Sequence, residues 1–317
     1  MRSESPRLPV RPRAGRAVAV PAAARGRARR APRAAWSVLW VVPALVVYAL
    51  FTLWPVVHSF GLSFFDWNGL SDPEFTGFDN YVEVMSDDTL RDSLWHAAVL
   101  VVFFSFLPVA IGLVTVALLT GARLRGMTFY RSVLFIPQIV PLVAVGITWR
   151  WMYSDQGAIN ELLRAIGLDA LARTWLGEPE FGLAAVGLIG TWIMTGLCMM
   201  LFLAGVGHID TALYEAVKLD GAGPIRAFFS ITIPQLRNEI TVALTITIVA
   251  ALASFDIVYV TTNGGPVDRT NVPGLLIYRL AFSRGEIGLA SALAVLLGAL
   301  ILVAVFLLNR LLRTDDE

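Results

Sequence analysis

The side chains best able to do chemistry are three histidines, one cysteine and a few acids within apolar sequence. His58, His96 and His208 fall in three separate regions, so their spacing does not indicate a metal site. Cys198 belongs to no Cys/His set and is most simply a small apolar core residue. Asp256 stands near one end of a strongly apolar run, and an acid in such a place is a functional candidate by default. We therefore predict no catalytic residue, no metal and no cofactor bound by this chain.

A second polar feature is the segment 207–238, which lies between two apolar runs. Asp210 can cap a helix over Thr211–Leu219, and Gly221 can end that helix with a positive φ. Gly223-Pro224 can open a second helix, which we expect Pro234 to close. A short helix with a small apolar face and a charged shoulder suits docking into a groove of a soluble partner. The alternative is an amphipathic loop that lies on a membrane surface.

Composition places these residues in a membrane protein. Apolar residues make up 56% of the chain, charged residues only 15%, and the mean hydropathy is +0.68. A soluble domain would have about a quarter charged residues. Six apolar stretches are long enough to cross a bilayer as helices of about 20 residues. We therefore predict an all-α polytopic membrane protein with six transmembrane helices, near 37–60, 93–120, 130–151, 183–206, 239–261 and 288–309.

The loop charges predict the orientation. The first 35 residues contain ten arginines and one acid, and the short 121–131 loop is also basic. The 61–92 loop has eight acids and one arginine, and the 152–182 loop has five acids and two arginines. Because basic loops stay inside, we expect both termini and the 207–238 segment to be cytoplasmic.

We divide the chain into a disordered basic tail (1–35), a transmembrane domain (36–312) and a short cytoplasmic tail (313–317). The basic tail has two interpretations, a topology signal or a binder of anionic lipid or nucleic acid. The topology signal is the simpler one, and we predict no nucleic-acid partner. The first apolar run is too long for the core of a signal peptide, so we expect it to be retained.

The 207–238 segment resembles the EAA motif of binding-protein-dependent ABC transporter permeases. The matching residues have the spacing of that motif and are Glu215, Ala216, Gly221, Ile231 and Pro234. Val217 and Ile233 are mild departures from it. Further similarity to carbohydrate permeases covers about residues 38–312 and includes Phe135-Ile136-Pro137, Trp149-Arg150-Trp151, Trp175-Leu176 and the stretch from Phe255 to Pro266. The Gly264-Gly265-Pro266 sequence is similar to the maltose- and glycerol-3-phosphate-type first permease subunits.

The resemblance implies a permease of the bacterial cytoplasmic membrane in which the 210–234 elbow is a coupling helix that contacts an ATPase. Residues expected to couple are Glu215, Ala216, Asp220, Gly221, Ile231 and Pro234. The implied partners are a cytoplasmic ABC ATPase dimer, a second homologous permease, an extracytoplasmic solute-binding protein and a sugar. The sequence has no G-x-x-x-x-G-K-[ST] phosphate loop, so ATP is expected to bind to the partner subunits.

Five residues are candidates for the substrate path. Asp256 lies close to the expected outer end of the fifth span, and stacking faces and hydrogen bonds for a sugar could come from Tyr259, Asn263, Trp192 and Gln138. The alternatives are an acid that reaches the lipid headgroups or bonds another helix, and aromatic residues that belong to the membrane interface.

Two other functions remain open at this point. One is an amino-acid or peptide importer, because the elbow is shared across importers. The other is a multi-span membrane enzyme, which should show clustered His, Asp or Glu side chains at a membrane interface.

Overall fold

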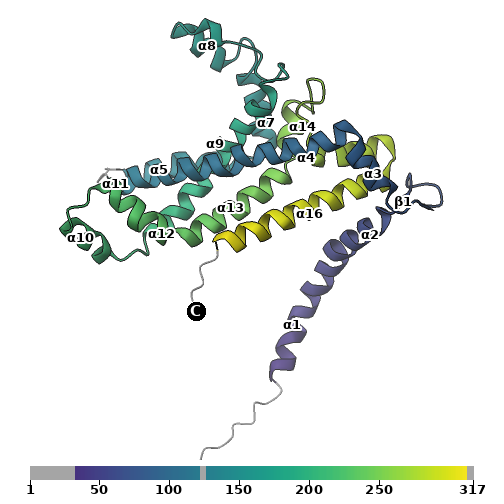
Figure 1. Cartoon of the computed structure of the whole chain (residues 1–317), viewed down its shortest axis with the longest axis horizontal. Coiled ribbons are helices and arrows are strands. Elements are labelled where there is room, and N and C mark those ends of the chain that lie inside the picture. The colour runs from purple at the N-terminus through teal and green to yellow at the C-terminus, as the bar shows by residue number, and fades with distance from the viewer. Residues whose placement is uncertain (1–32, 122–125, 313–317) are drawn as a thin grey trace, which may run out of the picture. The chain divides into compact units, whose positions relative to one another are not determined.

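The computed structural model describes residues 33–121 and 126–312, so most of the basic tail and residues 313–317 lie outside the described residues. The chain forms two units, Met1–Thr52 and Leu53–Glu317. Helix α1 (Arg33–Tyr48) belongs to the first unit, and a π-helical turn η1 (Ala49–Leu53) leads into the second (Figure 1).

The second unit is built almost entirely of helices. Its first half contains α2 (Trp54–Leu62), a two-stranded ribbon β1 (Phe65–Asp66) and β2 (Glu74–Phe75), α3 (Asp79–Ser86), α4 (Asp88–Val101), η2 (Val102–Phe106), α5 (Leu107–Gly121), α6 (Met127–Ile139), α7 (Leu142–Met152), α8 (Ala158–Ala165) and η3 (Asp169–Leu171). Its second half contains α9 (Gly182–Val206), α10 (Thr211–Leu219), α11 (Pro224–Ala227), η4 (Phe228–Thr232), α12 (Ile233–Gln235), α13 (Arg237–Leu252), α14 (Asp256–Thr261), α15 (Pro273–Tyr278), η5 (Arg279–Arg284) and α16 (Ile287–Leu312).

Four continuous helices in the described part of the chain are long and apolar enough to cross a membrane, and the total is six if two bent helix pairs each count as one span. The four are Trp40–Leu62, Asp88–Leu119, Gly182–Val206 and Ile287–Leu312. The bent pairs are Thr128–Ile139 with Leu142–Met152, and Pro224–Gln235 with Arg237–Leu252. The prediction of an all-α polytopic membrane protein is confirmed.

Two of the expected spans differ from continuous helices. The third bends by 98° between α6 and α7, where Val140 and Pro141 are extended because the residue before a proline disfavours the helical conformation. The fifth was expected over 239–261, but α13 ends at Leu252 and α14 begins at Asp256. Phe255, the residue before α14, has φ −136° and ψ −59°, so the helix is interrupted there.

Prolines explain three of the π-helical turns. The turns η1, η2 and η4 each end two residues before a proline, namely Pro55, Pro108 and Pro234. A proline has no N–H to donate and its ring clashes with the carbonyl four residues earlier, so the helix widens locally. In η2 the Leu107 N–H bonds Val102 O, which leaves Phe103 O without its usual helical donor. Thr191 Oγ1 of α9 donates to that carbonyl at 2.6 Å.

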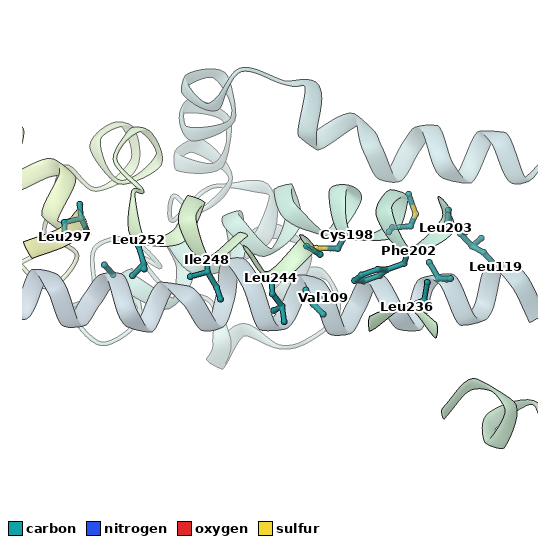
Figure 2. Close-up of a cluster of buried hydrophobic side chains, with 14 residues drawn as sticks. Val109, Leu119, Cys198, Phe202, Leu203, Leu236, Leu244, Ile248, Leu252 and Leu297 are labelled. Atoms are coloured by element: carbon teal, nitrogen blue, oxygen red, sulfur yellow. The ribbon is translucent and has the colours of Figure 1, made fainter. Parts of the chain in front are cut away.

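Helix α9 is the centre of the second unit. It packs against α5, α6 and α13, and its side of the core includes Cys198, Phe202 and Leu203 (Figure 2). Glycines allow the close approach: a Cβ on Gly190 would overlap the Phe104 ring, and one on Gly196 would lie 2.4 Å from Leu134 O of α6. Gly298 of α16 differs, since no described atom outside its own helix lies within 4 Å of its Cβ position.

Helix α9 lies between two segments that contain or adjoin candidate functional residues. Its 25 residues span about 37 Å at 1.5 Å per residue. The 153–181 segment with α8 precedes its first residue, and the α10–α12 elbow follows its last residue (Figure 1). Helix α13 then returns from the elbow toward α14.

Candidate functional site

Helix α10, the first helix of the elbow, begins and ends at the residues that the sequence predicted. Helix α10 covers Thr211–Leu219, and the Asp210 carboxylate accepts a hydrogen bond from the Ala212 N–H at 2.9 Å. Gly221 has φ 75°. The Ala222 N–H bonds Val217 O, and the Gly221 N–H bonds Lys218 O, both at 3.1 Å. These two bonds form a Schellman cap, which closes the last turn of α10.

Helix α10 has no buried residue. The coupling candidates Glu215, Ala216, Asp220 and Gly221 are all exposed, and Glu215 forms no ion pair among the residues that the structure describes. Leu219 is 89% exposed. A well-capped helix with no buried residue presents most of its surface for binding.

The last two coupling candidates have a different environment. Ile231 is buried within η4, and Pro234 lies in α12, one residue before the helix ends at Gln235. The chain then bends by 68° into α13. Pro234 was expected to close the helix, and the observed end is one residue later. These two residues therefore shape and anchor the elbow, whereas the other four are available on its surface.

One contact of the elbow was not predicted. The Tyr214 hydroxyl of α10 lies 2.9 Å from Thr232 Oγ1 of η4, and Thr232 itself is 5% exposed. This hydrogen bond ties the exposed helix to the segment that leads into α13. The two residues are 18 positions apart, and no local sequence signal indicates that they meet.

Three of the five path candidates lie on α14 and the turn after it. Asp256 is the exposed first residue of α14. Tyr259 stacks on Phe255 with ring centroids 5.2 Å apart and meets Tyr278 at 5.8 Å. Asn263, with φ 48°, accepts a hydrogen bond from Arg279 at its backbone oxygen. Tyr278 and Arg279 were not predicted as members of this group.

The other two path candidates lie on different helices. Trp192 of α9 is 42% exposed and meets Trp149 edge-on at 5.5 Å. The Gln138 side chain of α6 has a buried Oε1 atom without a hydrogen-bond partner. No hydrogen bond or ring contact within the described ranges joins either residue to Asp256.

The interruption between α13 and α14 adds one further polar atom. The Ser254 hydroxyl is buried in this break and has no hydrogen-bond partner in the described part of the chain. Buried hydroxyls without partners are rare, and helix breaks at membrane depth occur where the backbone lines a cavity or is buried in protein. Since neither proline nor glycine occupies 253–255, the sequence did not reveal this break.

The histidines and the cysteine occupy structural positions. The His96 ring nitrogen Nδ1 donates to Asn271 O at 2.8 Å, His208 Nδ1 donates to Ala204 O at 2.9 Å, and His58 stacks on Trp54. Cys198 is fully buried in the core cluster of Figure 2. In the two described ranges, no three His, Cys, Asp or Glu side chains are grouped so that they could hold a metal ion.

Comparison with known proteins agrees with the fold. Residues 114–314 match the family described as binding-protein-dependent transport system inner membrane component. The diacetylchitobiose uptake system permease protein NgcF of Streptomyces coelicolor is 35% identical over 312 residues, which cover 92% of this chain and 88% of NgcF. The trehalose/maltose transport system permease protein MalF of Thermococcus litoralis is 33% identical over 269 residues, which cover 83% of this chain and 89% of MalF.

A solved structure shows the same fold. The crystal structure of a bacterial ABC transporter involved in import of the acidic polysaccharide alginate matches with a TM-score of 0.75 and 21% identity. The match covers 90% of this chain and 98% of that chain. With the family match over 114–314 and relatives above 30% identity along most of its length, the chain belongs to the family of inner membrane components of binding-protein-dependent transport systems.

Proposed function

We propose that this chain is one of two permease subunits of an ATP-driven importer of a sugar or sugar derivative. Its elbow docks on a cytoplasmic ABC ATPase dimer, a second homologous permease completes the path, and an extracytoplasmic binding protein delivers the sugar. The observation that carries the proposal is the exposed, fully capped α10 at one end of α9. The sugar class is supported by relatives named for diacetylchitobiose and for trehalose/maltose transport.

The geometry suggests how the elbow acts on the path. A displacement of α10 passes through the Tyr214–Thr232 hydrogen bond into η4 and α12, and from there into α13. Helix α13 has 16 residues and is about 24 Å long. Its far end is the break that precedes Asp256. Closure of the ATPase pair would therefore move the end of α13 that borders the path candidates.

Two substitutions test the docking surface. Glu215→Lys reverses an exposed charge that has no ion pair among the described residues, and Gly221→Asp adds a side chain where a Cβ meets no described atom within 4 Å. Neither change should unfold the protein, although a side chain at φ 75° adds about 1 kcal/mol of backbone strain. We expect uptake of radiolabelled sugar to fall to less than about a tenth of wild type. This change corresponds to a loss of about 1.4 kcal/mol or more in the binding free energy between the elbow and the ATPase.

The matched control is Glu161→Lys, the same charge reversal at an exposed position on α8, beyond the other end of α9. It should leave uptake and ATPase co-purification unchanged. The immunoblot level of each variant in the membrane fraction must equal that of wild type. Normal uptake by both elbow variants would contradict the proposed function.

A further inference from the structure

A pocket of about 310 Å³ lies near the C-terminal end of α7, away from the elbow. Three segments that are far apart in the sequence surround it. The lining residues are Arg150, Tyr153 and Ser154 after α7, Thr174, Leu176 and Gly177 before α9, and Thr261, Thr262, Gly265 and Pro266 after α14. Each of these segments contains or adjoins a motif shared with carbohydrate permeases, yet the elbow and the path candidates leave the pocket unexplained.

Most hydroxyl groups of the pocket donate hydrogen bonds to carbonyl groups of the chain itself. Ser154 Oγ donates to Trp151 O, Thr261 Oγ1 to Ile257 O, and Thr262 Oγ1 to Val258 O. The Tyr153 hydroxyl donates to Ala185 O at 3.3 Å, and burial raises the pKa of this phenol to about 12, so it stays neutral. None of these hydroxyl groups therefore has its proton free for a ligand.

Two hydrogen-bond donors of the pocket have no partner in the described part of the chain. The Arg150 guanidinium and the Thr174 hydroxyl form no hydrogen bond or ion pair with any residue that the structure describes. The other arginines of this region differ, since Arg164 pairs with Asp155 at 3.0 Å and Arg173 with Glu178 at 3.8 Å. The ten lining residues include one cation and no acid.

This chemistry suits a carboxylate. A guanidinium offers parallel N–H groups that match the two carboxylate oxygens, and a hydroxyl can add a third donor. The pocket has the volume of about ten liquid waters, so one acidic side chain enters with water left around it. The pocket borders segments 153–181 and 262–272. The loop charges assign the first of them to the extracytoplasmic side, and a six-span topology puts the second on the same side.

We propose that this pocket receives one Asp or Glu side chain of the extracytoplasmic solute-binding protein and so holds that protein on this subunit. The inference rests on the proposed function, because it requires a binding-protein-dependent importer with this end outside. It adds the contact residues, Arg150 and Thr174, and the charge of the group that they bind.

The test uses the complete transporter, reconstituted in nanodiscs, and the solute-binding protein that supports uptake in the experiment above. ATP hydrolysis is measured against the concentration of that protein. Arg150→Gln should raise the half-saturating concentration about tenfold, the loss expected for a charge-assisted contact, while the maximal rate stays within about twofold. Arg150→Lys keeps the charge but loses the parallel N–H groups of the guanidinium. Its half-saturating concentration should lie between those of wild type and Arg150→Gln.

The matched control is Arg164→Gln, which removes an arginine of the same region that is already paired with Asp155. It should leave the half-saturating concentration unchanged. An unchanged value for Arg150→Gln, an equal rise in the control, or a lower maximal rate alone would each overturn the assignment. If wild type does not respond to a binding protein at all, the proposed function fails and the inference fails with it.

A charge exchange identifies the partner. Cells with Arg150→Glu should lose uptake, and suppressors should replace an acid of the binding protein by Lys or Arg. Suppressors found only in the permease or ATPase subunits would overturn the proposal.

Discussion

Thr191 shows how one side chain can compensate for a proline in a neighbouring helix. Pro108 supplies no N–H, and the carbonyl of Phe103 is left without its helical donor. In an apolar environment an unpaired carbonyl is costly, and the Thr191 hydroxyl supplies the missing bond from α9. The hydroxyl of Thr195, one turn later, only bonds the carbonyl of Thr191 in its own helix.

Thr191→Val keeps the shape of the side chain and removes this hydrogen bond. We expect it to lower the free energy of unfolding by about 1–3 kcal/mol, because the part-buried Phe103 carbonyl loses its hydrogen-bond partner. Thr195→Val should change it by less than about 0.5 kcal/mol, since its acceptor belongs to a regular helix. Thermal unfolding of the two purified variants compares them directly, and equal losses would contradict the role of Thr191.

At the scale of elements, local signals predicted the ends of α10 but not the break between α13 and α14. Helix α10 was predicted to the residue because Asp210 and Gly221 act on the turns next to them. The end of α13 at Leu252 was not predicted, because the break over 253–255 contains no helix-breaking residue. The Tyr214–Thr232 contact and the pocket around Arg150 likewise depend on segments that meet only in the folded chain.

The packing of α6 on α9 depends on Gly196. Gly196→Ala places a Cβ 2.4 Å from Leu134 O, so the two helices must separate, at a cost of about 1–3 kcal/mol. Gly298→Ala makes the same chemical change on α16, where nothing lies within 4 Å. Both gain the helix propensity of alanine, about 1 kcal/mol. We therefore expect a lower melting temperature only for Gly196→Ala, and a lower value for both would contradict this account.

At the scale of the molecule, the two candidate regions lie at opposite ends of the helices that join them. The elbow carries exposed side chains and few internal contacts, whereas the segment around α14 has an interrupted helix with the buried Ser254 hydroxyl unpaired. Helix α13 is the shortest covalent link between them. A rigid helix between a docking surface and a broken helix can transmit a displacement, provided that the elbow is fastened to it.

The Tyr214–Thr232 hydrogen bond connects α10 to the segment that leads into α13. Tyr214→Phe removes this hydrogen bond and keeps the aromatic ring. Because the exposed face of α10 is unchanged, the ATPase subunits should still co-purify, in contrast to Glu215→Lys. We expect sugar transported per ATP hydrolysed to fall several-fold, as a loss of about 1 kcal/mol of coupling would produce. Ser230→Ala, which removes a hydroxyl bonded only within its own helix to Arg226 O, should leave this ratio unchanged. Uptake and ATP hydrolysis measured in the same proteoliposomes give the ratio, and a wild-type value for Tyr214→Phe would show that the elbow transmits its movement by another contact.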